Sequence, residues 1–186
     1  MTSRGGETFG IARAVSEIDE LLTRPLPEAG PTAYEWLPVT QEWTLVKGRG
    51  FLIAPLWESD SFTGLYGSEW DEASEAGEAN LAALADALDD RWGPHRQVGM
   101  RVPMMRKIAN EPMPLLFRTL CDNDLLGDLS VWGPTGPSGR RPGAGPGPGP
   151  EGGRRWVGVS VSQCDGDAPM ILTAVVTDQP LTELPG

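Results

Sequence analysis

Carboxylates are the most concentrated reactive side chains of this sequence, and most of them lie in its first half. The stretch from Glu58 to Asp90 contains no lysine or arginine. Its acidic residues are Glu58, Asp60, Glu69, Asp71, Glu72, Glu75, Glu78, Asp86, Asp89 and Asp90. The summed field of such a run attracts a basic surface and repels nucleic-acid phosphates and anionic lipid. The run therefore predicts a basic protein partner and argues against binding to nucleic acid or to a membrane.

Tryptophans accompany the acidic run. Of the seven tryptophans, four lie between Trp36 and Trp70. Tryptophan is rarely fully buried and is enriched at the energetic centres of protein interfaces. The predicted partner-binding residues are Trp57, Glu58, Asp60, Trp70, Glu69, Asp71, Glu72 and Glu75. The alternative is that these rings fill an ordinary core or cover the edges of a sheet.

The single histidine, His95, is the one candidate general base of a Ser-His-Asp or Cys-His mechanism. The Gly-x-Ser-x-Gly context of many serine hydrolases is absent. His95 follows Gly93-Pro94, which is typical of a histidine that lies exposed beyond the end of a helix. We therefore assign no catalytic residue.

Metal and cofactor motifs are also missing. There is no C-x-x-C, no H-E-x-x-H and no Walker or dinucleotide fingerprint. Asp122-Asn-Asp124 followed by Asp128 is similar to a calcium loop, but Leu126 and Gly133 stand where oxygen ligands belong. Cys164-Asp-Gly-Asp167 is typical of a turn. We expect no metal and no cofactor.

Length and composition indicate one domain over residues 1–186. No apolar stretch approaches the roughly 18 residues of a membrane span, and the amino-terminal residues do not form a secretory signal. The two cysteines, Cys121 and Cys164, are then expected to be reduced. We expect a cytoplasmic protein with a net charge of −11.

Two helices and a hairpin are expected in the first half. Residues 9–23 carry apolar side chains at helical spacing, and Pro25 and Pro27 end this helix. Residues 25–43 form a connector. Residues 44–47 and 51–57 form a strand hairpin, and residues 69–92 form a long helix. Ser68 and Asp71 have the spacing of a capping box, and Gly77 divides the long helix.

In the second half the pattern predicts strands over 97–102, 128–132, 157–161 and 170–177, the last of them central. Short helices are expected near 104–110 and 115–121. Residues 133–155 consist almost wholly of Gly, Pro, Arg and Ser, which predicts a flexible loop inserted between two strands.

These elements predict an α+β fold in which helices pack on one face of an antiparallel sheet of about four to six strands. Two functions remain open. The first is a non-enzymatic acidic domain that binds a basic partner, as an immunity-type or antitoxin-type inhibitor or an adaptor does. The alternative is a small enzyme or ligand-binding domain whose pocket contains carboxylates, drawn from Asp122, Asp124 and Asp128 or from Asp165 and Asp167.

Overall fold

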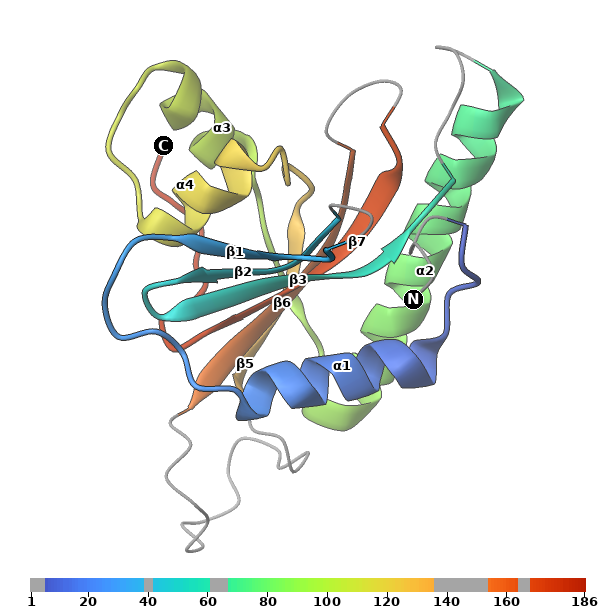
Figure 1. The fold of residues 1–186 in the computed structure, drawn as a ribbon, viewed down its shortest axis with the longest axis horizontal. Coiled ribbons are helices and arrows are strands. Elements are labelled where there is room, and N and C mark those ends of the chain that lie inside the picture. The colour runs from blue at the N-terminus through green and yellow to red at the C-terminus, as the bar shows by residue number, and fades with distance from the viewer. Residues whose placement is uncertain (1–5, 39–41, 61–66, 136–153, 164–167) are drawn as a thin grey trace, which may run out of the picture.

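A computed structural model describes residues 6–38, 42–60, 67–135, 154–163 and 168–186. Helices and strands alternate irregularly along the chain (Figure 1). In chain order they are α1 (Ile11–Thr23), β1 (Ala33–Trp36), β2 (Trp43–Gly48), β3 (Phe51–Glu58), α2 (Ser68–Trp92), β4 (Arg96–Val98), α3 (Arg101–Ile108), α4 (Leu115–Asp122), β5 (Leu129–Thr135), β6 (Arg155–Gln163) and β7 (Met170–Thr177).

The described strands form one sheet in the order β1-β2-β3-β7-β6-β5-β4, and every neighbouring pair is antiparallel. The middle strand is β7, whose residues are all buried. This confirms the α+β class, the antiparallel sheet and the central place of residues 170–177. The sheet has seven strands, more than the four to six expected.

Both faces of the sheet are covered. Successive side chains of a strand point to opposite faces. Leu45 and Leu52 accordingly pack with the buried residues of α1 and α2, whereas Val46 and Ile53 pack with those of α4 and with Leu181 of the carboxy-terminal segment. Figure 1 shows α1 and α2 on one side of the sheet and α3 and α4 on the other. Helices were expected on a single face of the sheet. Instead, α1 and α2 cover one face, and α3 and α4 lie on the other.

The long helix α2 differs in two details from the expected one. It runs without a break through Gly77, which is buried. Gly67 is its N-cap and makes no side-chain capping bond. Ser68 is already inside the helix, so the predicted capping box of Ser68 and Asp71 is wrong.

Two strand assignments change. The strand expected over 97–102 ends at Val98, and α3 begins at Arg101. The connector expected over 25–43 contains β1, which pairs with β2. Hydrogen bonds to β2 make β1 a strand although all four of its residues are exposed, so no burial pattern marked it in the sequence.

The Gly/Pro-rich stretch connects β5 to β6, which are paired neighbours, as the sequence predicts for an insertion between strands. The predicted bounds of 133–155 are too wide, because residues 133–135 belong to β5 and Arg155 to β6, where Thr135 pairs with Arg155. Residues 136–153 lie outside the described residues. None of the described helices combines the length and the apolar character needed to cross a membrane.

Candidate functional site

The acidic residues of α2 lie on two parts of the helix: a later part that packs on the sheet, here called the supported half, and an earlier part that has no buried residue. The first residue of α2 that is buried is Gly77, and the turns before it are exposed or half-buried. Figure 1 shows this beginning of α2 extending beyond the sheet. We name the exposed carboxylates of these turns, together with Glu78 directly after Gly77, the acidic helix end: Glu69, Asp71, Glu72, Glu75 and Glu78.

The electrostatics of the acidic helix end are one-sided. Glu69 and Asp71 lie in the first turn, where the positive end of the helix dipole stabilises a carboxylate. The ion pairs found among the described residues include none of the five carboxylates. Within the described part of the chain, the acidic helix end is therefore a surface of negative charge that no ion pair neutralises.

Trp70 lies within the acidic helix end. Its side chain is 37% exposed, and its indole N–H donates a hydrogen bond of 2.9 Å to Oε1 of Gln163, near the end of β6. The amide of Gln163 in turn donates to the carbonyl of Ala168. These bonds hold the ring in place while part of it stays open to a partner.

The remaining predicted partner-binding residues lie at the end of β3. Trp57 is buried, its indole N–H donates to the carbonyl of Glu7 at 2.9 Å, and its ring packs beside Gly77. Trp57 therefore belongs to the core and not to the partner-binding surface predicted from the sequence. Glu58 is half-buried, and Asp60 is exposed just beyond it.

A second cluster of polar side chains joins the end of α2 to β5. Oδ1 of Asp89 accepts three hydrogen bonds: from the backbone N–H of His95 (2.9 Å), from Nδ1 of His95 (3.0 Å) and from the indole of Trp132 (2.8 Å). The rings of His95 and Trp132 lie 5.3 Å apart. Desolvation alone would raise the pKa of Asp89, but the hydrogen bonds from His95 and Trp132 outweigh it and the pKa is lowered.

The Asp89–His95 pair has the geometry by which a carboxylate orients a catalytic histidine. A triad also needs a hydroxyl or thiol bonded to the other ring nitrogen. The described residues supply no such bond to Nε2. The expected exposed histidine is instead partly buried, at 28% exposure, and its bonds to Asp89 hold the chain where α2 ends.

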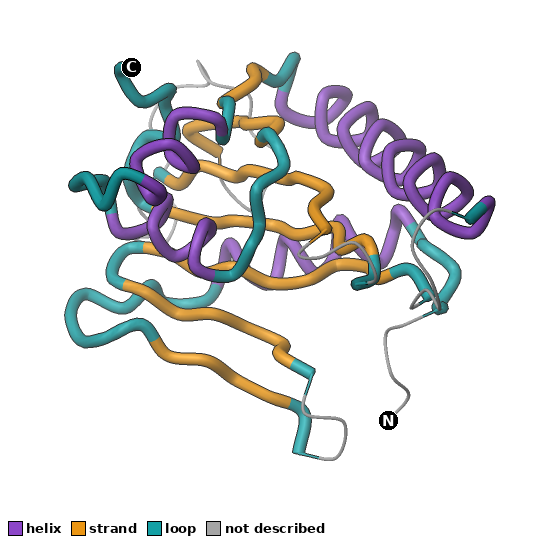
Figure 2. The backbone as a smooth tube through the Cα atoms, turned by 90° about the horizontal axis from the view of Figure 1, so that it is seen from above, coloured by secondary structure: helices purple, strands orange, loops and turns teal. Residues whose placement is uncertain are grey.

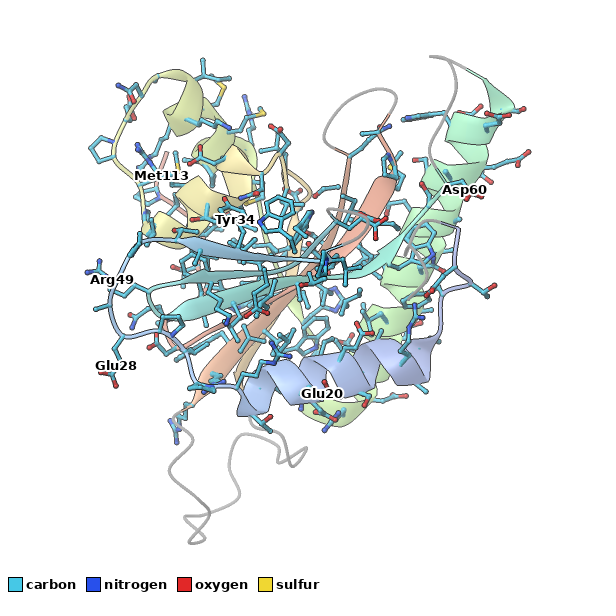
Figure 3. All side chains as sticks on the ribbon, in the orientation of Figure 1. Glu20, Glu28, Tyr34, Arg49, Asp60 and Met113 are labelled. Atoms are coloured by element: carbon cyan, nitrogen blue, oxygen red, sulfur yellow. The ribbon has the colours of Figure 1, made fainter. Side chains whose placement is uncertain are left out.

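A groove of about 730 Å³ lies on the α4 side of the sheet. Its apolar lining includes Phe51, Phe117 and Leu181, and its charged lining residues are Glu28, Arg49 and Asp178. Figure 3 shows Glu28 and Arg49 on the same side of the molecule. The carboxylates predicted for a pocket are elsewhere: Asp122, Asp124 and Asp128 are exposed and do not line it, and Asp165 and Asp167 lie outside the described residues.

Metal-binding and thiol chemistry find little support. Among the residues that the structure describes, no group of three or more His, Cys, Asp or Glu is placed to hold a metal. Cys121 is buried and unbridged. Burial raises the pKa of its thiol, which disfavours the nucleophilic thiolate. Cys164 lies outside the described residues.

One aromatic surface was not anticipated from the sequence. Tyr34 and Trp36 of β1 stack with ring centroids 5.8 Å apart and planes inclined by 24°. The hydroxyl of Tyr34 accepts a hydrogen bond of 3.1 Å from the amide of Asn123, which follows α4. The signal in the sequence was the spacing of two residues, which puts both rings on one face only if the segment is a strand.

Comparison of the chain with protein-family models, curated proteins and solved structures found no match.

Proposed function

We propose that this protein binds a basic protein partner through the acidic helix end and Trp70. Its action is that of an inhibitor of the immunity or antitoxin type, or of an adaptor, and its location is the cytoplasm that the sequence predicts. The observation that supports the proposal most is the exposure of five carboxylates around a fixed, partly exposed tryptophan, without ion pairs among the described residues.

The spacing of these carboxylates adds a physical argument. Asp71 and Glu75 are four residues apart, and Glu72 and Glu78 are each three residues from Glu75. Like charges at these spacings destabilise a helix by roughly 0.2–0.5 kcal/mol per pair. A basic surface bound to this end of α2 would relieve the repulsion. The relief of this repulsion would contribute favourably to the free energy of binding.

Electrostatic attraction also makes association fast and salt-dependent. A partner is first isolated on the immobilised protein and eluted by stepped salt. Its association rate is then measured for the wild type and for a variant that carries Glu69→Lys, Asp71→Lys, Glu72→Lys and Glu75→Lys. We expect the variant to associate at least about tenfold more slowly at low salt, and the difference to shrink as salt is added.

A control on the same helix reverses two charges instead of four. Asp86→Lys with Asp90→Lys changes exposed carboxylates of the supported half of α2. We expect this control to keep most of the wild-type rate. The fourfold lysine variant is called the acidic-end variant. If circular dichroism shows that it is folded and its association rate equals that of the wild type, the proposal is wrong.

The alternative, a small enzyme or ligand-binding domain, is favoured by one observation. The groove beside Phe117 has the volume of a small-molecule site and is lined by two carboxylates, Glu28 and Asp178. A thermal-shift screen of small cationic and polar compounds tests it. A hit whose stabilisation is lost in Asp178→Asn supports a ligand site, whereas hits that bind this variant equally well lie elsewhere.

A further inference from the structure

Strand β1 leaves one side of its backbone available. It is the outermost strand of the described sheet and pairs with β2 alone. All four of its residues are exposed. Alternate residues of a strand direct their N–H and C=O groups to opposite sides, so half of these groups face away from β2. Figure 2 shows β1 at the edge of the sheet, far from α2. Such an edge can accept one more strand.

The aromatic pair on β1 supplies a side-chain platform beside this edge. Tyr34 is 39% exposed and Trp36 is 53% exposed, and the two rings are stacked. Tyr34 is held by Asn123, as its position between β1 and α4 in Figure 3 illustrates. Across the strand pair, Tyr34 is opposite Val46 and Trp36 is opposite Trp43. Tyr34 is therefore held before any partner arrives, and Trp36 stacks on it.

The charges next to this platform favour a cation. Asp122 and Asp124 are exposed and flank Asn123 in the sequence. Lys47 pairs with Glu35 and Lys107 with Asp122, so the charge of Asp122 is partly offset. Asp124 takes part in none of the ion pairs of the described residues and is the carboxylate that favours a cation most. The faces of tryptophan and tyrosine rings also attract guanidinium and ammonium groups. The carboxyl end of α4 adds the negative end of a helix dipole.

We propose that an extended segment of a basic protein, with Arg or Lys at alternate positions, adds to β1 as an eighth strand. Side chains at alternate positions fall on one face, so its cations lie over Tyr34 and Trp36. A second copy of this chain is the weaker occupant, because each copy carries a net charge of −11. The inference rests on the proposed function only for the sign of the partner's charge.

The test uses synthetic peptides and the full chain. The probe is a capped seven-residue peptide of alternating Arg and Val. Two control peptides replace Arg by Glu, or carry N-methyl groups on alternate residues to block the backbone hydrogen bonds of one edge. Amide chemical shifts and calorimetry measure binding. We expect saturable shifts of residues 33–36 and 122–124, and at least tenfold weaker binding of both control peptides.

Two variants locate the site. Trp36→Lys places a like charge at the edge and should weaken the Arg peptide at least tenfold, whereas Met105→Lys, an equally exposed position on α3, should leave binding unchanged. If Trp36→Lys does not fold, Trp36→Ala should still weaken binding several-fold. Wild-type affinity in a folded Trp36 variant would overturn the inference, as would a failure to bind.

Two other outcomes also overturn it and separate it from the proposed function. Chemical-shift changes confined to the acidic helix end would show that the basic peptide binds α2 and not β1. This result would leave the proposed function standing. A concentration-dependent dimer that Trp36→Lys abolishes would identify a second copy as the occupant of β1. Conversely, intact peptide binding by the acidic-end variant, together with unchanged partner binding, would remove the proposed function and keep the β1 site.

Discussion

Asp89 connects three parts of the chain through one carboxylate. Its oxygens accept from the backbone and ring of His95, which follows the helix, and from Trp132 of β5. The lowered pKa means that the folded state favours the ionised form. The contribution of Asp89 to stability is therefore fully present above its unfolded pKa, near 3.8, and is lost as the pH falls through the lower folded value.

Replacing Asp89 by alanine should lower the free energy of unfolding by about 2–3 kcal/mol at pH 7, because it leaves partly buried N–H groups without an acceptor. Urea unfolding of the wild type and of Asp89→Ala measures this loss. The difference should narrow as the pH falls below 3.8. Asp90→Ala, at the exposed neighbouring position, is the control. A difference that widened as the pH fell below 3.8 would contradict the assigned role.

At the residue scale, the sequence predicted exposure better than contact. The carboxylates Glu69, Asp71, Glu72 and Glu75 are exposed as a run without basic residues suggested. Bonds between distant segments, such as Asp89 to Trp132 or Tyr34 to Asn123, depend on how strands are ordered in the sheet. No spacing in the sequence encodes that order. The burial of Trp57 likewise follows from the packing of α2 on β3.

At the element scale, α2 has an exposed beginning and a buried-face remainder, separated by Gly77. A methyl group at this position would lie 3.0 Å from Cγ2 of Val161 and 3.7 Å from the ring of Trp57. The glycine therefore permits the close approach of α2 to the sheet. From this contact onward the helix packs on the sheet, whereas before it the helix is exposed or half-buried and is joined to β6 by the hydrogen bond of Trp70 to Gln163.

Gly77→Leu should cost about 1–2 kcal/mol of unfolding free energy, because the strain of overpacking exceeds the gain of up to about 1 kcal/mol in helix propensity. Ala76→Leu changes the preceding, exposed position and should stay within about 0.5 kcal/mol of the wild type. Thermal and urea unfolding measure both. A Gly77→Leu variant as stable as Ala76→Leu would show that the close contact with the sheet is not needed.

Elements with a buried face were predictable, and elements without one were not. The apolar patterns of α1, β2, β3 and β7 reproduce the observed elements closely. By contrast, β1 is exposed throughout, and the apolar alternation Val98, Met100, Val102 continues past the end of β4 into α3. There, tertiary packing of the α3–α4 pair outweighs the alternating pattern.

The whole molecule is dominated by its negative charge. Residues 1–100 hold 17 acidic and 7 basic side chains, and residues 101–186 hold 9 and 8. Self-repulsion of this kind opposes compactness and weakens when salt screens it. The free protein should therefore be less stable at low ionic strength than at physiological ionic strength.

Raising NaCl from about 10 mM to 0.2 M should raise Tm, by about 2–4 °C for each kcal/mol of repulsion removed. The rise should be smaller in Glu72→Lys with Glu75→Lys, which already has four fewer units of net negative charge. Differential scanning calorimetry in parallel salt series measures both proteins. A Tm that is independent of NaCl would mean that the carboxylates do not repel one another appreciably in the native state.

The middle position of β7 has a consequence for folding during synthesis. Of the seven strands, β7 is the last to leave the ribosome, yet it alone joins the half built from β1, β2 and β3 to the half built from β4, β5 and β6. Until residues 170–177 emerge, β3 and β6 are two open, apolar edges on one nascent chain. The sheet is completed when β7 pairs with both β3 and β6. A chain that stalls before residue 170 therefore exposes strand edges that chaperones bind or that aggregate.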